Sequence, residues 1–173
     1  MSSYYTKTHN ILRAISPMFG WMVAPDPNDA TLYGVEGSWN HTLKDGIKWS
    51  GAASWNHTEQ SGQPLVGEAK WLMTQGVIWN LSEAWKMGAN YRYQGEIITP
   101  TSPITGTSTP LESSHQLNLT ANWSGLGQGS TLQLGVENVL DHDLRYPSTS
   151  SVAYPEHYSR PGRFIWVGID IPL

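Results

Sequence analysis

Thr131–Leu173 contains Leu134-Gly-Val-Glu-Asn-Val-Leu-Asp141, a long polar loop, and Arg160-Pro-Gly-Arg163 running directly into Phe164-Ile-Trp-Val-Gly-Ile-Asp-Ile-Pro-Leu173. In the final run the aliphatic residues lie two apart, so an extended chain places all of them on one side: Ile165, Val167, Ile169, Ile171 and Leu173. A tilted strand needs about 9–11 residues to cross a bilayer. We therefore predict that residues 164–173 form a membrane-crossing strand.

Aromatic usage is the clearest feature of the composition. The 173 residues include nine Trp and eight Tyr but only two Phe. Trp and Tyr favour a membrane–water boundary, because each joins an apolar body to a polar edge. The mean hydropathy of −0.37 and the lack of any run of about 18 apolar residues exclude a helical membrane protein. They do not exclude a barrel, whose strands are polar on one face.

Charge, cysteine content and the N-terminal sequence further narrow the class of protein. The formal charge of −4 is mild and argues neither for a nucleic-acid partner nor for an anionic membrane surface, and we expect no nucleic-acid partner. A chain without Cys has no disulfide framework. Met1–Asn10 has no basic region followed by an apolar core, so we predict no signal peptide there. Because an outer-membrane protein must be exported, we expect a mature form or a part of a longer protein.

Alternating polar and apolar residues predict about eight strands. The clearest are 31–43 and 47–58, which form a hairpin through the Asp-Gly turn at 44–46. The next pair is 71–80, in which two apolar residues fall out of phase, and 85–95. A weaker strand over 4–14 precedes these four, and strands over 116–123, 132–137 and 164–173 follow them.

The connections alternate in length. Those at 15–30, 60–69, 96–114 and 141–162 are long, and those at 44–46, 81–84 and 124–130 are short. Outer-membrane barrels have long extracellular loops and short periplasmic turns. If the C-terminus is periplasmic, every long loop lies outside. The predicted fold class is therefore all-β, with antiparallel transmembrane barrel strands.

Charges in the strand interiors lie on one side only. By the alternation they all fall opposite the Trp, Leu and Ile side chains: Glu36, Lys48, Lys86, Arg92, Glu137 and Asp170. Lipid enforces such segregation, since Lys or Arg facing it at mid-depth costs about 2–4 kcal/mol. Water enforces it too in a half-buried sheet, so the pattern predicts an amphipathic sheet.

The C-terminal stretch resembles the end of TonB-dependent outer-membrane receptors. The shared elements are Asn138-Val-Leu-Asp141 at the end of one strand, Pro161-Gly-Arg163 after a loop, and the alternating closing strand. Upstream, Tyr33-Gly-Val-Glu-Gly37 and Gly62-Gln-Pro-Leu65 are similar to the matching region of the same receptors, so the likeness covers about residues 28–173.

This resemblance implies a location, partners and a function. Such receptors lie in the bacterial outer membrane, contact its lipid, and import scarce ligands such as ferric siderophores or cobalamin. Their barrels have about 22 strands, so residues 1–173 would be the C-terminal third, without the plug domain or signal peptide. TonB would act only through the missing N-terminal parts, and loops 60–69, 96–114 and 141–162 would contribute to ligand capture.

Two alternatives belong to other classes. A complete eight-stranded outer-membrane barrel with a structural or adhesive role fits the even strand number. A soluble β-barrel that binds a small ligand inside would need the Trp- and Tyr-rich face as its core. Detergent dependence distinguishes this second alternative.

The sequence singles out a few groups of polar residues. Glu36 and Glu137 recur in two Gly-Val-Glu triplets and either touch a ligand or are ordinary polar wall residues. His41 and His57 follow Asn in two Asn-His-Thr triplets but do not sit opposite one another. Residues 141–143, Asp-His-Asp, could bind a cation, although three adjacent side chains converge poorly. We assign no catalytic, cofactor or metal residues, expect no enzyme activity, and leave the ligand-binding residues unknown.

Overall fold

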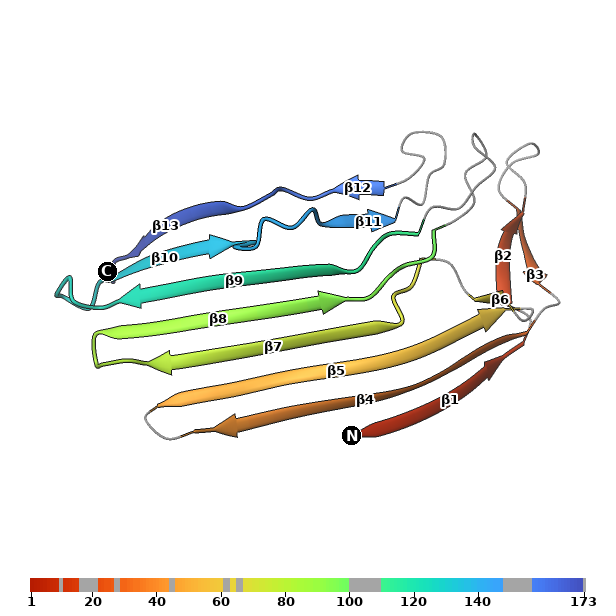
Figure 1. The fold of residues 1–173 in the computed structure, drawn as a ribbon, viewed down its shortest axis with the longest axis horizontal. Helices are drawn as coiled ribbons and strands as arrows, with labels where there is room; N and C mark the ends of the chain where they lie inside the picture. Colours follow the sequence, from red (N-terminus) through yellow and green to blue (C-terminus); the bar gives the residue numbers. More distant parts are fainter. Residues whose placement is uncertain are drawn as a thin grey trace.

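The computed structural model describes residues 1–9, 11–15, 22–26, 29–43, 46–60, 63–64, 67–99, 110–147 and 157–172. Within these ranges every helix-or-strand element is a strand. Eight of them follow one another across a single antiparallel sheet (Figure 1): β1 (Ser2–Thr8), β4 (Ala30–Thr42), β5 (Ile47–Gln60), β7 (Trp71–Asn80), β8 (Trp85–Gln94), β9 (Ser114–Trp123), β10 (Thr131–Glu137) and β13 (Phe164–Asp170). The prediction of an all-β, antiparallel fold with about eight strands is confirmed.

The remaining strands are short and lie in the long connections. β2 (Ile11–Ile15) pairs with β3 (Met22–Asp26), β6 (Gln63–Pro64) pairs with the end of β5, and β11 (Arg145–Pro147) pairs with β12 (His157–Ser159). Figure 1 shows all long connections at one end of the sheet and all short turns at the other. The predicted alternation of loop lengths is therefore confirmed. Residues 16–21, 27–28, 61–62, 65–66, 100–109 and 148–156 of the predicted loops, and residues 44–45 of the predicted Asp-Gly turn, lie outside the described ranges.

Two predicted strands were too long. Residues 4–14 do not form one strand, because β1 loses its partner after Thr8, which pairs with the first residue of β4, Ala30. The chain then enters the separate β2–β3 pair. The closing strand ends at Asp170, because Asp170 pairs with Thr131, the first residue of β10, and Leu173 of the predicted strand lies outside the described residues. Beyond these two points the ladder offers no further partner.

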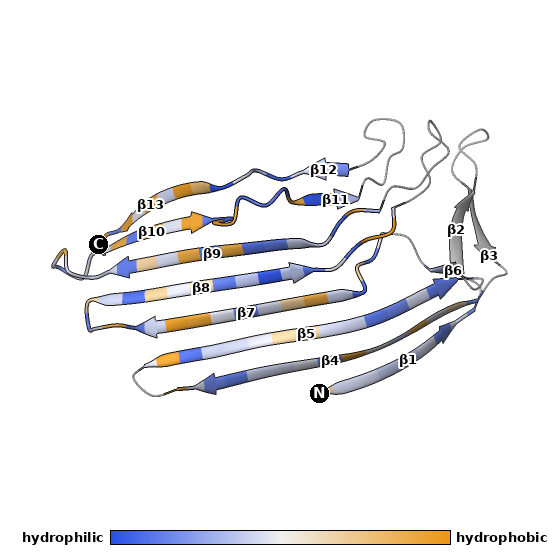
Figure 2. Cartoon of the chain, in the orientation of Figure 1, coloured by the Kyte–Doolittle hydropathy of each residue, from blue (hydrophilic) through white to orange (hydrophobic). Residues whose placement is uncertain are grey.

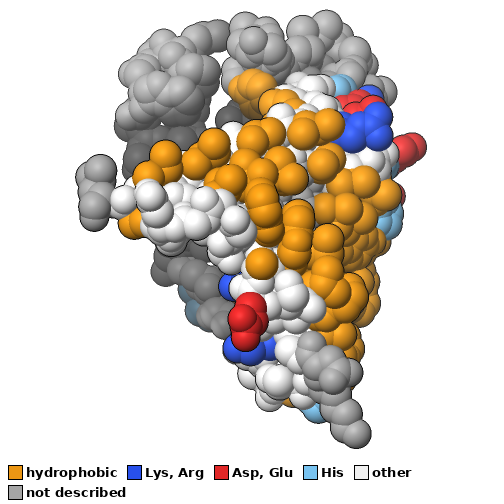
Figure 3. All heavy atoms as spheres, turned by 90° about the vertical axis from the view of Figure 1, so that its left-hand side faces the viewer, with side chains coloured by type: hydrophobic (Ala, Val, Ile, Leu, Met, Phe, Trp, Pro, Cys, Tyr) orange, Lys and Arg blue, Asp and Glu red, His pale blue; other side chains and the backbone are white. Residues whose placement is uncertain are grey.

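The register gives the sheet two chemically different faces. On the polar face, one row across five strands consists of Asn40, Ser50, Gly76, Asn90 and Asn118. The next row on the apolar face contains Trp49, Val77, Ala89 and Leu119. All six charges predicted opposite the apolar side chains lie on the polar face, and Leu72 and Ile78 lie there too, as their phase predicted. Figure 3, which views the short-turn end, shows apolar side chains gathered along one side.

Aromatic side chains form two rows across the apolar face. Four strands carry aromatic or imidazole rings eight residues apart: Trp49 and His57, Trp71 and Trp79, Trp85 and Tyr93, His115 and Trp123. Rings in neighbouring strands contact one another, with centroids 6.0 Å apart for Trp85 and Trp123, and 5.1 Å apart for Tyr93 and His115. Eight residues span about 26 Å along a strand, which at a barrel strand tilt of about 40° is about 20 Å of height, somewhat less than the apolar band of about 25 Å between the aromatic girdles of a barrel.

Between the two rows most side chains are apolar, and those of β13 are the most exposed. Ile165, Val167 and Ile169 of β13 are 73%, 65% and 61% exposed. The buried apolar side chains among the described residues are Ala69, Ile97, Leu111 and Leu144, all in the connections. Figure 2 shows that hydrophobic stretches are spread along the strands of the sheet. In water an apolar surface of this extent marks an interaction face, so the apolar face is not the core of a soluble barrel.

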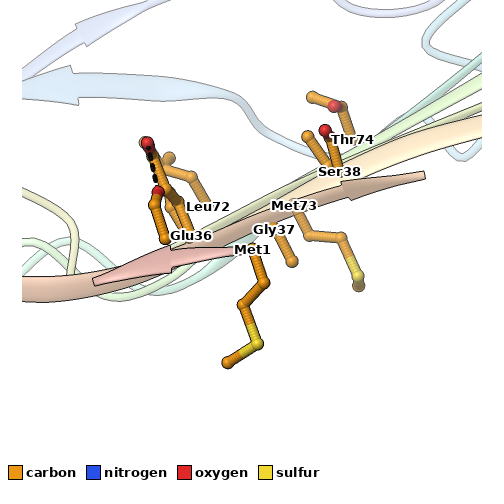
Figure 4. A pocket seen from close by; sticks show the side chains of 11 residues that line it. Met1, Glu36, Gly37, Ser38, Leu72, Met73 and Thr74 are labelled. Carbon is orange, nitrogen blue, oxygen red and sulfur yellow. Dashed lines mark hydrogen bonds between the residues drawn. The ribbon is translucent and has the colours of Figure 1, made fainter.

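The sheet does not close within the described residues, since β1 and β13 lie at opposite edges. At one edge, β1 pairs with β4 only as far as Ser2 and Glu36, and residues 37–42 of β4 have no strand on that side among the described residues. A hollow of about 440 Å³ marks this point. Figure 4 shows that its side chains lie on both sides of the sheet, with Glu36 and Thr74 on one side and Met73 on the other. It is a sheet edge and not a ligand cavity.

Candidate functional site

Three arginines converge at the long-loop end of the polar face. Arg92 extends from β8, while Arg145 belongs to β11 and Arg160 follows β12. Together they line one hollow, whose other lining residues are Gln94, Ser114, Gln116, Leu144 and Tyr146. Arg92 reaches this side because it pairs with Gln116 on the polar face of β9. The pairing of β11 with β12 brings Arg145 and Arg160 to the same hollow, and we call these three residues the basic rim.

The basic rim carries more positive than negative charge. Arg145 is matched by Asp143, with its Nε donating to Oδ2 at 2.7 Å and a terminal nitrogen 2.5 Å from the same oxygen. This hydrogen bond holds the pKa of Asp143 below its usual value. The Arg160 guanidinium lies 5.5 Å from the centre of the Tyr146 ring, a cation–π geometry. Among the described residues, no carboxylate pairs with Arg92 or Arg160.

A hydrogen-bonded turn after β10 positions the hairpin that carries this charge. Asn138 is 2% exposed, and its side chain both donates to the His142 carbonyl at 2.9 Å and accepts from the His142 N–H at 3.2 Å. Its own N–H donates to Asn118 Oδ1 at 3.0 Å. The backbone at Asn138 has φ +49°, a left-handed conformation that Asn tolerates better than most residues. The buried amide thus links the polar face of β9 to the start of the loop.

The same turn reaches forward to the closing strand. Asp141 Oδ1 accepts a hydrogen bond from the Arg163 N–H at 2.8 Å, and the Arg163 side chain lies 3.6 Å from Asp141 Oδ2. A Cβ added at Gly162 would come within 3.1 Å of Asp141 Oδ1, so a glycine fits this close approach. The two motifs 138–141 and 161–163 are therefore in direct contact.

The connections predicted to capture a ligand meet in part. Ile97 forms isolated β-bridges with Ala69 on one side and Leu111 on the other, and the three side chains make a small buried cluster. The bridges join the loop around 60–69 to both ends of the loop around 96–114. The tips of these loops lie outside the described ranges. The described parts of the two loops are therefore joined to each other at the long-loop end of the sheet.

The two Gly-Val-Glu carboxylates do not form a joint site. Glu36 on β4 accepts a hydrogen bond from the Ser2 hydroxyl at 2.9 Å. Glu137 on β10 pairs in register with Phe164. Four strands separate β4 from β10, although both carboxylates lie on the polar face. This placement favours the interpretation that both are ordinary polar residues of the barrel wall.

The two histidines of the Asn-His-Thr triplets are also apart, as predicted. His41 pairs with Trp49 near the short-turn end. His57 pairs with Tyr33 near the long-loop end, its ring 5.0 Å from the Tyr33 ring and its Nε2 3.5 Å from Glu59 Oε2.

The side chains of 141–143 point to three different partners. Asp141 bonds to the Arg163 backbone, His142 Nε2 lies 3.3 Å from the Ser113 carbonyl oxygen, and Asp143 binds Arg145. Within the described ranges, no group of three or more His, Asp or Glu residues is arranged to hold a metal ion. These contacts favour the structural interpretation of the triplet.

The basic rim itself was missed by sequence reasoning. Alternation placed Arg92 correctly on the polar face, but the other two arginines lie in what was treated as an unstructured loop. Tyr146 pairs with Tyr158 across β11 and β12. In the sequence these two tyrosines flank a segment that contains Pro and Ser, and this pattern was the available signal for two paired strands. No local pattern specifies that Arg145 and Arg160 lie beside Arg92.

Comparison with known families identifies the fold. The model of the TonB-dependent receptor-like β-barrel matches residues 1–139. The chain belongs to this family. The match begins upstream of the resemblance found at 28–173 and ends within Asn138-Val-Leu-Asp141. The members of the family are transport receptors and not enzymes.

Solved structures with the same fold are siderophore receptors. A mutant of the ferric enterobactin receptor PfeA from Pseudomonas aeruginosa has a TM-score of 0.69 at 17% identity, covering 96% of this chain and 27% of that one. The ferric-catecholate import receptor Fiu from E. coli K12 has 0.75 at 14%, covering 95% and 24%. P. aeruginosa FpvA bound to heterologous pyoverdines has 0.78 at 13%, covering 95% and 23%. Residues 1–173 thus span about a quarter of each structure.

Two further comparisons were negative. No curated protein matches the sequence at a significant level. No helix among the described residues is long and apolar enough to span a membrane.

Proposed function

We propose that residues 1–173 form part of the barrel of an outer-membrane receptor that imports an anionic metal complex of the ferric siderophore type. The observation that carries this proposal is the basic rim, which lies on the polar face where a barrel holds its lumen. Family membership supports a transport receptor. The printed ligands of the similar structures, ferric enterobactin, ferric catecholate and pyoverdine, support the class of ligand.

The chemistry of the basic rim suits a large anion. Guanidinium groups present several N–H donors in one plane and match oxyanions with paired hydrogen bonds. Arg92 and Arg160 have no described carboxylate partner, so their charge is available to a ligand, and Tyr146 offers an aromatic face beside them. In this proposal the arginines bind the organic chelator and the iron travels as cargo. The protein itself supplies no metal ligand.

The remaining parts of such a receptor are proposed from the family. A plug domain and a TonB-contacting segment would lie in other parts of a longer protein, since this chain spans about a quarter of the similar structures. The apolar face with its two aromatic rows would contact outer-membrane lipid. The basic rim would then face the cell exterior together with the long connections.

Ligand binding by arginine variants tests the proposal. In the full-length protein that contains these residues, Arg92→Ala combined with Arg160→Ala should weaken binding of ferric enterobactin by about tenfold or more, because a hydrogen bond to a charged group contributes about 1.5–3 kcal/mol. Calorimetry in detergent measures the Kd. Lys86→Ala is the matched control, since Lys86 lies on the same polar face near the short turns and pairs with Asn122. It should leave the Kd unchanged.

A second ligand separates anion recognition from general uptake. Cyanocobalamin lacks the dense negative charge of a ferric catecholate, so any binding of it should not depend on Arg92 and Arg160. An unchanged Kd for ferric enterobactin in the double variant would contradict the role of the basic rim. If the unmodified protein bound neither ligand, the proposed ligand class itself would be wrong.

The alternative of a complete eight-stranded barrel requires β1 to pair with β13. In the sheet order these two strands are the outermost ones. No observation favours this alternative over a partial barrel.

A further inference from the structure

A second hollow adjoins the basic rim at the long-loop end. It has a volume of about 360 Å³, and Arg145 lines both hollows. Two histidines line the second one, His142 from the turn after β10 and His157 from β12. Two acidic residues, Glu112 and Asp143, line it as well. We call it the histidine hollow.

The Asp143 carboxylate links the two hollows electrostatically. Its Oδ2 accepts a hydrogen bond from Arg145 Nε at 2.7 Å. The pKa of Asp143 lies below its usual value, first because of this hydrogen bond and then because of the nearby charges of Arg145, His157 and His142. When both imidazole rings are neutral, Arg145 is the cation that Asp143 neutralises. When both rings are charged, one negative charge is shared among three cations.

His142 can gain a proton without losing its contacts. Its Nε2 lies 3.3 Å from the Ser113 carbonyl oxygen. A carbonyl oxygen only accepts, so Nε2 carries the proton of the neutral ring and a second proton binds Nδ1. The backbone of His142 is held separately by the Asn138 side chain. Protonation therefore adds charge to the histidine hollow and leaves the turn in place.

The fixed charges of the histidine hollow nearly cancel. Besides the two histidines, its lining contains two carboxylates and one guanidinium: Glu112, Asp143 and Arg145. Asp141, the preceding carboxylate of the same turn, is engaged by Arg163. Two negative charges and one positive charge give −1 with neutral rings, and two protonated rings change this to +1. Imidazole side chains change charge between about pH 5 and pH 8, so two positive charges appear beside the basic rim over this range.

A third histidine contacts this group from β9. The His115 ring lies 5.7 Å from the His142 ring, edge to face. Its Nδ1 lies 2.7 Å from the Tyr91 hydroxyl, and its ring lies 5.1 Å from that of Tyr93. A neutral His115 can accept the phenol hydrogen at Nδ1, whereas a charged one would face a protonated His142. The added charge therefore belongs to His142 and His157.

We propose that the histidine hollow makes anion binding at the basic rim depend on pH. Protonation of His142 and His157 adds positive charge beside Arg145, so an anionic ligand binds more tightly as the pH falls from about 8 to about 5.5. The inference rests on the proposed function, since the basic rim must bind an anion for it to hold. It adds a means of regulation by residues that do not line the basic rim. Because linkage is reciprocal, ligand binding also draws protons onto these rings.

Calorimetry of the full-length protein in detergent, at about pH 8 and about pH 5.5, tests the inference with ferric enterobactin as the probe. The compared quantity is the Kd at the higher pH divided by the Kd at the lower pH. This ratio should be about fivefold larger in the unmodified protein than in the double variant His142→Gln with His157→Gln. Two unit charges about 8 Å from one unit of ligand charge in water give an effect of this size. Gln keeps an N–H donor for the Ser113 carbonyl but cannot gain a charge.

Two further variants serve as controls. The titration of the ligand itself is common to all of the proteins, so it cancels in the comparison. His41→Gln should leave the ratio unchanged, because His41 pairs with Trp49 near the short turns. Asp143→Asn removes the carboxylate that neutralises Arg145, and it should tighten binding at about pH 8 by about twofold. Weaker binding in this variant would contradict the electrostatic link between the hollows.

The number of protons bound with the ligand gives a second readout. Near pH 6.5, titrations in buffers of different ionisation enthalpy should show more proton uptake by the unmodified protein than by the double variant. If the double variant fails to bind at about pH 8, His157→Gln alone repeats the test and leaves the contacts of His142 intact, with about a twofold change in the ratio expected.

The outcomes separate this inference from the proposed function. Equal Kd ratios, or equal proton uptake, in the unmodified protein and the histidine variants would overturn the inference and leave the proposed function standing. If the unmodified protein bound ferric enterobactin at neither pH, the proposed function would be contradicted, and the inference would fall with it.

Discussion

The polar and apolar faces belong to the same eight strands but are held in different ways. On the polar face, side chains bond to named partners: Gln116 donates to Asn118 at 3.2 Å, and Asn118 accepts from the Asn138 backbone. On the apolar face the aliphatic residues between the aromatic rows have no protein covering them. The first face therefore depends on particular pairs. The stability of the second face depends on the medium around the molecule, so the hydrophobicity of its side chains matters more than how closely they fit one another.

The largest effect is expected from a charge on the apolar face. Leu119→Arg places a guanidinium between the aromatic rows, where 41% of the leucine side chain is exposed to the surroundings. In a bilayer this should cost about 2–4 kcal/mol. Denaturant unfolding of the full-length protein in lipid vesicles measures the loss.

The adjacent residue is the matched control. Thr120 points to the polar face, where it pairs with Gly88 and Gly135. Thr120→Arg adds the same charge one position away and should change the unfolding free energy by less than about 0.5 kcal/mol. Equal losses at both positions would mean that the two faces have the same surroundings, and the membrane assignment would then be abandoned.

On the polar face, the most sensitive position should be Asn138. Replacement by Ala leaves the His142 N–H and carbonyl without their side-chain partner in a site that is 2% exposed. The expected cost is about 1–3 kcal/mol. Asn138→Gly loses the same hydrogen bonds, but glycine tolerates the φ of +49°. The difference in unfolding free energy between the two variants therefore gives the cost of placing Ala in this left-handed backbone conformation. Unfolding in vesicles with no loss in either variant would show that the turn is not held by this amide.

The same contrast explains what the sequence could predict. The apolar face follows from period-two alternation, so Trp49, Val77 and Leu119 were placed correctly from residue type alone. Strand ends were predicted less well, because they depend on where the neighbouring strand stops, as at Thr8 and Asp170. The basic rim was not predictable, since Arg145 and Arg160 lie beside Arg92 only through the pairing of β11 with β12, which no local pattern specifies. Asn138 was recognised through its family motif and not through its bonding.

A pair of glycines tests packing within the apolar face. A Cβ added at Gly51 would lie 2.3 Å from the Trp39 ring, whereas one added at Gly37 meets nothing within 4 Å. Gly51→Ala should therefore displace the Trp39 ring and lower the free energy of unfolding by about 1 kcal/mol. This value is the cost of overpacking less the stability that Ala adds to a strand relative to Gly. Gly37→Ala should be neutral or stabilising by up to about 1 kcal/mol. Unfolding free energies and tryptophan emission spectra measure both, and equal effects would contradict the observed ring position.

The smallest effect concerns an amide that lies on the apolar face between the two aromatic rows. Gln75 lies on that face between Gly51 and Tyr91, and its Oε1 accepts a hydrogen bond from Trp49 Nε1 at 3.2 Å. Gln75→Leu and Trp49→Phe should each cost about 0.5–1.5 kcal/mol, since each leaves one polar group unpaired. The double variant should cost less than the sum by about 0.6 kcal/mol, the average coupling of such bonds in membranes. A double-mutant cycle in vesicles measures this coupling. Strict additivity would mean that lipid or water satisfies both groups and that the Trp49–Gln75 bond adds no specific interaction to the apolar face.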